Sequence, residues 1–69
     1  MEHSERLRKA FKDKGLSITF IAKKLNVDRR TVYQRLEDVG SFKAKEIEVL
    51  ADLLRMSNKE RDSIFFSNY

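Results

Sequence analysis

Apolar residues recur every three or four positions in five short segments of the chain, and this spacing is the period of an amphipathic helix. The segments predict helices over about residues 4–14, 18–25, 28–38, 44–55 and 57–66. No proline interrupts them, and the two glycines lie where helices are expected to end. The expected fold class is therefore all-α, a compact five-helix bundle with very short connections.

Residues that favour helix ends stand between the predicted helices. Asn26 follows the second helix, and asparagine tolerates a positive φ better than most residues. Ser57 and Glu60 have the spacing of a capping box, in which each side chain accepts from the other residue's backbone N–H. The predicted N-caps are Ser4, Ser17, Asp28 and Ser57.

The stretch IAKKLNVDRRTVYQRLEDVG, residues 21–40, holds the second and third predicted helices with a break of three residues between them. On a helical wheel, Val32 and Leu36 lie close together and define the buried direction of the third helix. Arg30 and Gln34 then point almost directly away from the core. Two helices joined at a steep angle by so short a turn form a helix-turn-helix, whose second helix can lie in the major groove of DNA.

The outward side chains suit such a groove. Arginine can pair through two hydrogen bonds with O6 and N7 of guanine, and glutamine can pair in the same way with N6 and N7 of adenine. Arg29, in the first turn, can reach past the helix end. Backbone N–H groups near Ser17 and Thr19 can bind a phosphate. Lys43 and Lys45, around the start of the fourth helix, can bind others.

The net charge of +4 is unevenly distributed. Residues 1–35 carry ten basic and four acidic side chains, a balance of +6, whereas residues 36–69 carry five basic and seven acidic side chains, a balance of −2. A basic half joined to a mildly acidic half predicts contact with a polyanion on one side of the domain only.

The segment SITFIAKKLNVDRRTV resembles the helix-turn-helix of the Cro and phage-repressor (XRE-like) DNA-binding family. The matching positions are Ala22 at a close helix crossing, residues 25–27 across the turn, and Thr31 with Val32 in the third helix. FKAKEIEVLADLLRMSNKERDSIFF is similar to the last two helices of small phage Cro-like regulators. The resemblance spans about residues 5–66 and implies a lambda-repressor-like domain that acts as a sequence-specific transcriptional regulator. It implies that the second helix and the loop before the fourth hold phosphates, and that the base- and groove-facing residues are Arg29, Arg30, Tyr33 and Gln34.

Three positions depart from that family. Ile18 stands where the family often has a glutamine that touches phosphate, Asn26 replaces a glycine, and Asp28 replaces a serine or threonine. The alternative hypothesis is therefore a protein-interaction module on a helix-turn-helix scaffold, an anti-repressor or antitoxin that binds another regulator. Ile18, Asp28 and the acidic second half favour this alternative.

Length and composition exclude other classes of function. A chain of 69 residues predicts one domain, residues 1–69, and without cysteine it has neither a disulfide nor a thiolate metal site. His3 is the only histidine, and no serine or carboxylate has a base beside it, so we expect no enzyme activity, metal or cofactor. No apolar run approaches the roughly 20 residues that span a bilayer. We expect a soluble protein of the bacterial cytoplasm, bound to double-stranded DNA and not to a membrane.

One reading helix covers only about half of a recognition site, so we expect a weak homodimer, or a monomer that pairs only on DNA. The predicted contact is the C-terminal end, at Phe65, Phe66 and Tyr69. Adjacent helix positions diverge by about 100°, so one of Phe65 and Phe66 should be buried and the other exposed.

Overall fold

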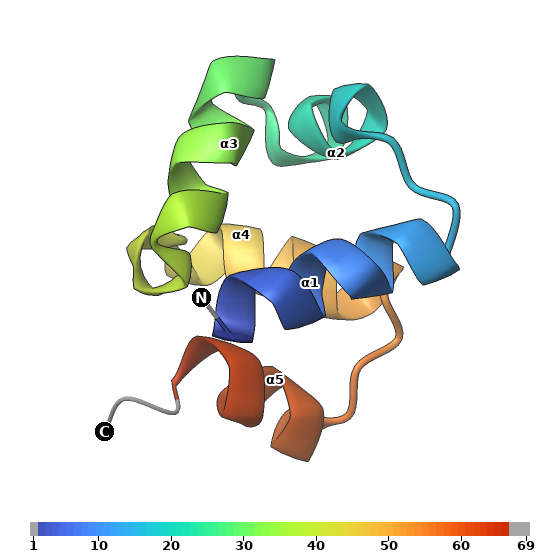
Figure 1. Cartoon of the computed structure of the whole chain (residues 1–69), viewed down its shortest axis with the longest axis vertical. Coiled ribbons are helices and arrows are strands. Elements are labelled where there is room, and N and C mark those ends of the chain that lie inside the picture. Colours follow the sequence, from blue (N-terminus) through green and yellow to red (C-terminus); the bar gives the residue numbers. More distant parts are fainter. Residues whose placement is uncertain (1, 67–69) are drawn as a thin grey trace.

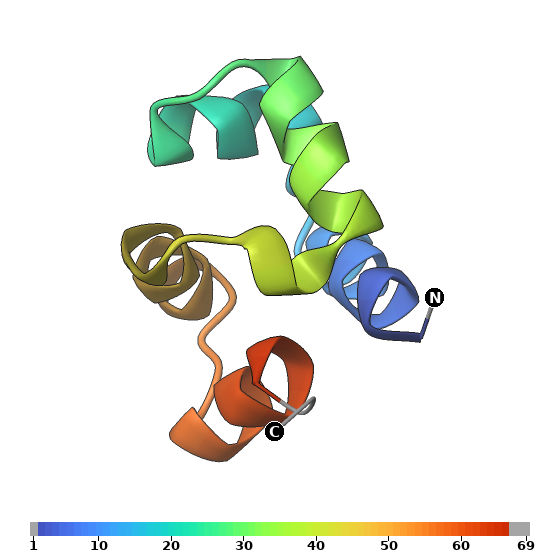
Figure 2. The ribbon, with the colours of Figure 1, turned by 90° about the vertical axis from the view of Figure 1, so that its left-hand side faces the viewer.

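The structure is a computed structural model, and it describes residues 2–66. Its elements in chain order are α1 (Glu2–Asp13), α2 (Ile18–Leu25), α3 (Arg29–Glu37), the 3₁₀ turn η1 (Val39–Ser41), α4 (Ala44–Leu53) and α5 (Asn58–Phe65). Within this range there is no strand, and no helix is long and apolar enough to cross a membrane. Figures 1 and 2 show α2 and α3 at one end of the globule and α5 at the other. The predicted all-α fold is confirmed.

The inward faces of the helices form one core. Leu7, Ile21, Val32, Leu36 and Leu50 have no exposed surface. The rings of Phe42 and Phe65 meet edge to face, with centroids 5.6 Å apart and planes at 87°, so the segment before α4 is packed against α5. The other buried apolar side chains are Phe11, Ala22, Leu25, Val39, Ile47, Leu54 and Ile64.

Three helices end in the same way, with a residue in the left-handed conformation followed by a backbone hydrogen bond that closes the last turn. The left-handed residues are Gly15 after α1, Asn26 after α2 and Arg55 after α4, with φ of 70°, 59° and 52°. In each case the next N–H donates to a carbonyl five residues back, as Val27 does to Ala22 at 3.0 Å. These bonds define Schellman motifs, which satisfy carbonyls that the helix leaves unpaired. The role of Asn26 is confirmed, whereas Arg55 was not expected there.

Most of the predicted caps are confirmed. The Ser17 hydroxyl accepts from the Phe20 N–H at 3.1 Å, and the Asp28 carboxylate accepts from the Thr31 N–H at 2.8 Å. Ser57 and Glu60 form the expected capping box, with both hydrogen bonds at 3.1 Å.

The prediction for Ser4 is wrong, because α1 begins at Glu2 and contains Ser4 within it. There its hydroxyl accepts from Nε of Arg8 at 3.2 Å. The third helix also ends earlier than expected, and the chain continues as η1, which places Val39 and Phe42 in the core.

Ala22 is only 5% exposed on α2, the helix that packs against α3 and α4. Ala22→Leu is expected to lower the free energy of unfolding by about 1–3 kcal/mol, because extra methylene groups would overpack this crossing. Urea denaturation measures the effect, and Lys23→Leu, on the exposed side of the same helix, is the matched control. Equal stability of Ala22→Leu and the wild type would show that the crossing is not tight.

Candidate nucleic-acid interface

The turn between α2 and α3 fixes the direction of α3. Asn26 takes the left-handed conformation, Val27 packs against the core, and Asp28 caps the helix. Figures 1 and 2 show α3 standing steeply to α2 at the edge of the molecule. Since Val32 and Leu36 are fully buried, the rotation of α3 about its own axis is also fixed.

The side of α3 opposite this buried stripe faces solvent. Arg29, Arg30 and Gln34 are exposed, and Tyr33 retains 43% of its surface. The side chains of Arg29, Arg30 and Gln34 make no hydrogen bond or ion pair with any of residues 2–66. The structure thus brings all four predicted base-facing residues onto one exposed surface and leaves the donors of its arginines and glutamine available to a ligand.

The negative charge of Asp28 is already engaged. Hydrogen bonds from the side chain and the backbone N–H of Thr31 hold the pKa of Asp28 below its usual value. Their effect is larger than that of the slight desolvation, which raises the pKa, and the charge of Arg30 lowers the pKa a little further. Asp28 therefore stays ionised as the cap of α3, and a cation lies beside it. A polyanion bound beside α3 would therefore meet a carboxylate whose charge is partly offset by Arg30.

The predicted phosphate contacts lie on two segments. Ser17 and Thr19 are exposed at the start of α2, where the first N–H groups of a helix have no partner within it. Because the Ser17 hydroxyl is occupied as the N-cap, a phosphate there would be bound chiefly by backbone N–H groups. Lys43 is exposed immediately before α4.

Lys45 lies beside the end of α2, where with Lys24 and Asn26 it borders a hollow of about 230 Å³. Lys24 itself lies 5.4 Å from the centre of the Phe20 ring, in a cation–π contact that orients its side chain. The structure therefore groups Lys45 with Lys24, a pairing that the sequence did not indicate.

A nearly buried ion pair connects α3 to α4. Nε of Arg35 donates to Oε1 of Glu46 at 2.7 Å, and its second guanidinium nitrogen donates to Oε2 at 3.2 Å. The side chains are only 19% and 8% exposed. Oε1 of Glu46 also accepts from the backbone N–H of Lys43 at 2.9 Å. One carboxylate thus holds both α3 and Lys43, the residue immediately before α4.

This pair was not found from the sequence, where Arg35 and Glu46 counted only toward the charge balance. Burial raises the pKa of Glu46, but the hydrogen bonds and charges of Arg35 and Lys43 together lower it more, and the net direction is downward. Glu46 therefore remains ionised near neutral pH. The only available sequence signal was an acid in the first turn of α4, which does not identify its partner.

Of the two adjacent C-terminal phenylalanines, one is buried and the other is exposed, as expected. Phe65 is 4% exposed and belongs to the core, so it is not a surface contact, whereas Phe66 is 39% exposed. Tyr69 lies outside the described residues. Phe66 borders a shallow hollow of about 400 Å³ over Ala44 and Ile47.

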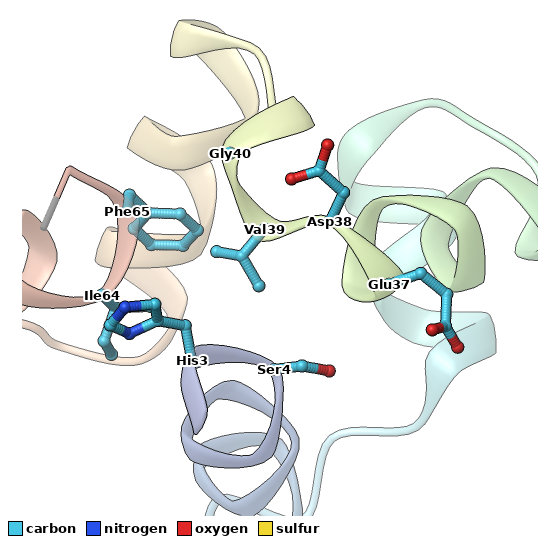
Figure 3. A pocket seen from close by; sticks show the side chains of 8 residues that line it. All are labelled: His3, Ser4, Glu37, Asp38, Val39, Gly40, Ile64 and Phe65. Atoms are coloured by element: carbon cyan, nitrogen blue, oxygen red, sulfur yellow. The ribbon is translucent and has the colours of Figure 1, made fainter. Parts of the chain in front are cut away.

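His3 lines a separate cavity of about 220 Å³ between the start of α1, η1 and α5. Figure 3 shows its imidazole beside Ile64, while the carboxylates of Glu37 and Asp38 point away from it. No group of three potential metal ligands occurs among residues 2–66. The surface of α3 is therefore the stronger candidate for a functional site.

No protein-family model, curated protein or solved structure matches the chain, so geometry, charge and the local sequence pattern carry the interpretation of this surface.

Proposed function

We propose that the protein is a sequence-specific DNA-binding transcriptional regulator with a helix-turn-helix formed by α2 and α3. In this proposal α3 enters the major groove and reads base edges with Arg29, Arg30, Tyr33 and Gln34. The start of α2 and the lysines at α4 hold the phosphate backbone on either side. The resemblance to Cro and phage repressors supports the same assignment.

The observation that carries the proposal is the exposed side of α3. Two arginines and a glutamine, all able to form paired hydrogen bonds with bases, lie there without partners among residues 2–66. The basic half of the chain, residues 1–35, contributes α2 and all of α3 except Leu36 and Glu37.

Selection of bound sites from a random DNA pool, followed by titration of a selected duplex and a scrambled duplex over a range of salt concentrations, tests this function. We expect binding that prefers the selected duplex and weakens steeply with salt, because each neutralised phosphate releases counterions. Binding without preference would contradict sequence reading by α3. No binding even at low salt would favour the alternative, a module that binds another regulator.

A dimer on DNA is part of the proposal, with Phe66 at the contact. Phe66→Asp is expected to abolish cooperative occupation of a palindromic site whose half-sites lie about one DNA turn, ~34 Å, apart. Binding to a single half-site should be unchanged, since Phe66 follows α5, and α5 lies at the opposite end of the globule from α2 and the start of α3. Sedimentation and titration of both duplexes measure these effects, and Asn58→Asp on the exposed start of α5 is the control. Cooperative binding by the Phe66 variant would place the dimer contact elsewhere.

A further inference from the structure

A second surface lies away from α3, where the end of α1, the α4–α5 connection and the start of α5 surround a groove of about 430 Å³. Figure 1 shows these three segments together on the side of the molecule away from α3. No residue of α2 or α3 lines the groove. A ligand could therefore occupy the groove while α3 is bound to another molecule.

The floor of this groove is apolar and its rim is basic. Leu54 and Ile64 are nearly buried beneath it, and Ala10 and Met56 are partly exposed. The rim carries four cationic and two acidic side chains, namely Arg6, Lys9, Lys14, Arg55, Asp13 and Glu60. The surface thus offers both burial for an aliphatic side chain and positive charge around it.

The two acids of the rim are already engaged. Asp13 pairs with Lys9 at 3.0 Å, and Glu60 accepts from the Ser57 N–H in the capping box. The side chains of Lys14 and Arg55, in contrast, make no hydrogen bond or ion pair within residues 2–66, although Lys14 is near enough to Glu60 for its charge to help lower the pKa of that carboxyl. Two cations are therefore left to receive a negatively charged ligand.

Arg55 adds an independent observation, because its backbone is in the left-handed conformation at φ 52°. Glycine adopts this conformation without steric cost, whereas an arginine is strained there. The corresponding position after α1 is Gly15. The left-handed Arg55 ends α4, and its guanidinium, which makes no hydrogen bond or ion pair within residues 2–66, belongs to the groove rim.

We propose that this groove docks an acidic peptide segment of a partner protein, with its carboxylates against Lys14 and Arg55 and an aliphatic side chain over Met56. The apolar floor favours a peptide over a nucleic-acid backbone, which would require polar contacts along the groove. This proposal does not rest on DNA binding, and it gives a regulator bound through α3 a separate surface for a protein partner.

NMR titration of the full chain with the peptide Glu-Glu-Leu-Glu-Glu-Leu-Glu tests the proposal. We expect amide shifts at Lys14, Arg55 and Ile64 but not along α3. A peptide with serine in place of both leucines should bind more weakly, because it cannot use the floor. Equal binding of the two peptides, shifts confined to α3, or no shifts at millimolar peptide would each overturn the docking site.

Variants separate docking from stability. Arg55→Gly should raise the midpoint temperature of unfolding, because the strain is relieved, yet weaken peptide binding about fivefold by removing a surface cation. Arg55→Lys should retain most of the affinity. Asn26→Gly relieves a similar backbone conformation far from the groove and should leave peptide binding unchanged. If Arg55→Gly binds the peptide as tightly as Asn26→Gly does, Arg55 has no docking role and the proposal is wrong.

Discussion

Glu46→Ala is expected to lower the free energy of unfolding by about 2–4 kcal/mol, the largest single effect on stability that we expect at a charged residue. The change removes both hydrogen bonds from Arg35 and leaves its nearly buried guanidinium without a partner. It also removes the acceptor for the Lys43 N–H at the start of α4. Urea denaturation at neutral pH measures the loss, and Glu48→Ala, an exposed acid on the same helix, is the control. Equal stability of the two variants would refute a structural role for the pair.

The same pair predicts how stability depends on pH. Since the folded-state pKa of Glu46 lies below its unfolded value of about 4.5, its contribution is complete above that value. The contribution is lost as the pH falls through the lower folded-state pKa, where the carboxylate becomes protonated. The pKa values of Asp28 and Glu60 are also lowered. Protonation of these two carboxylates and of Glu46 should therefore each reduce the free energy of unfolding of the wild type in acid. The difference in free energy of unfolding between the wild type and Glu46→Gln, measured from neutral pH downward, reports the contribution of Glu46 alone. This difference should become smaller as the pH falls.

The ion pair also bears on function, because Arg35 is on α3 between the outward Gln34 and the buried Leu36. Its guanidinium is held from the α4 side, so α3 cannot roll without breaking two hydrogen bonds. Preorganising a recognition element in this way reduces the entropy lost on binding. In the proposed interface we therefore expect Arg35 to position α3 and not to contact DNA itself.

The sequence predicted the elements better than it predicted their connections. The helical period identified every helix, and Val32 and Leu36 proved fully buried because an amphipathic stripe determines its own inward direction. Ser4 shows the limit of capping signals, since a serine near the start of a helix can equally lie inside it. The turn η1 was missed because it depends on burial of Val39 and Phe42, which is a tertiary effect.

For the candidate site, the sequence predicted the exposed residues of α3 but not the contacts between helices. Arg30 and Gln34 follow from one helical wheel, so their exposure could be predicted from local spacing. The pairing of Arg35 with Glu46 joins residues eleven positions apart on different helices, and no local rule fixes such a contact. Arg55 was missed because left-handed arginines are uncommon, and glycine was the expected signal for a helix end.

Arg30→Ala and Gln34→Ala are each expected to weaken binding to a selected DNA site by about 1–3 kcal/mol and to relax preference at one base position. Both residues project from the exposed side of α3, so their removal should leave the core and the free energy of unfolding unchanged. The double variant should lose most discrimination between the selected and scrambled duplexes. Titration of duplexes that carry every base at each position measures these preferences.

Two further variants make this test specific to base reading. Arg30→Lys keeps the charge but loses the paired geometry, so it should retain salt-sensitive binding and still lose the base preference. Lys43→Ala should instead weaken binding to all sequences alike and reduce the salt slope by about one, as expected for a phosphate contact. If Arg30→Ala and Gln34→Ala keep the wild-type site preference, α3 is not the reading helix. Its unpaired arginines and glutamine would then belong to an interface with a protein partner.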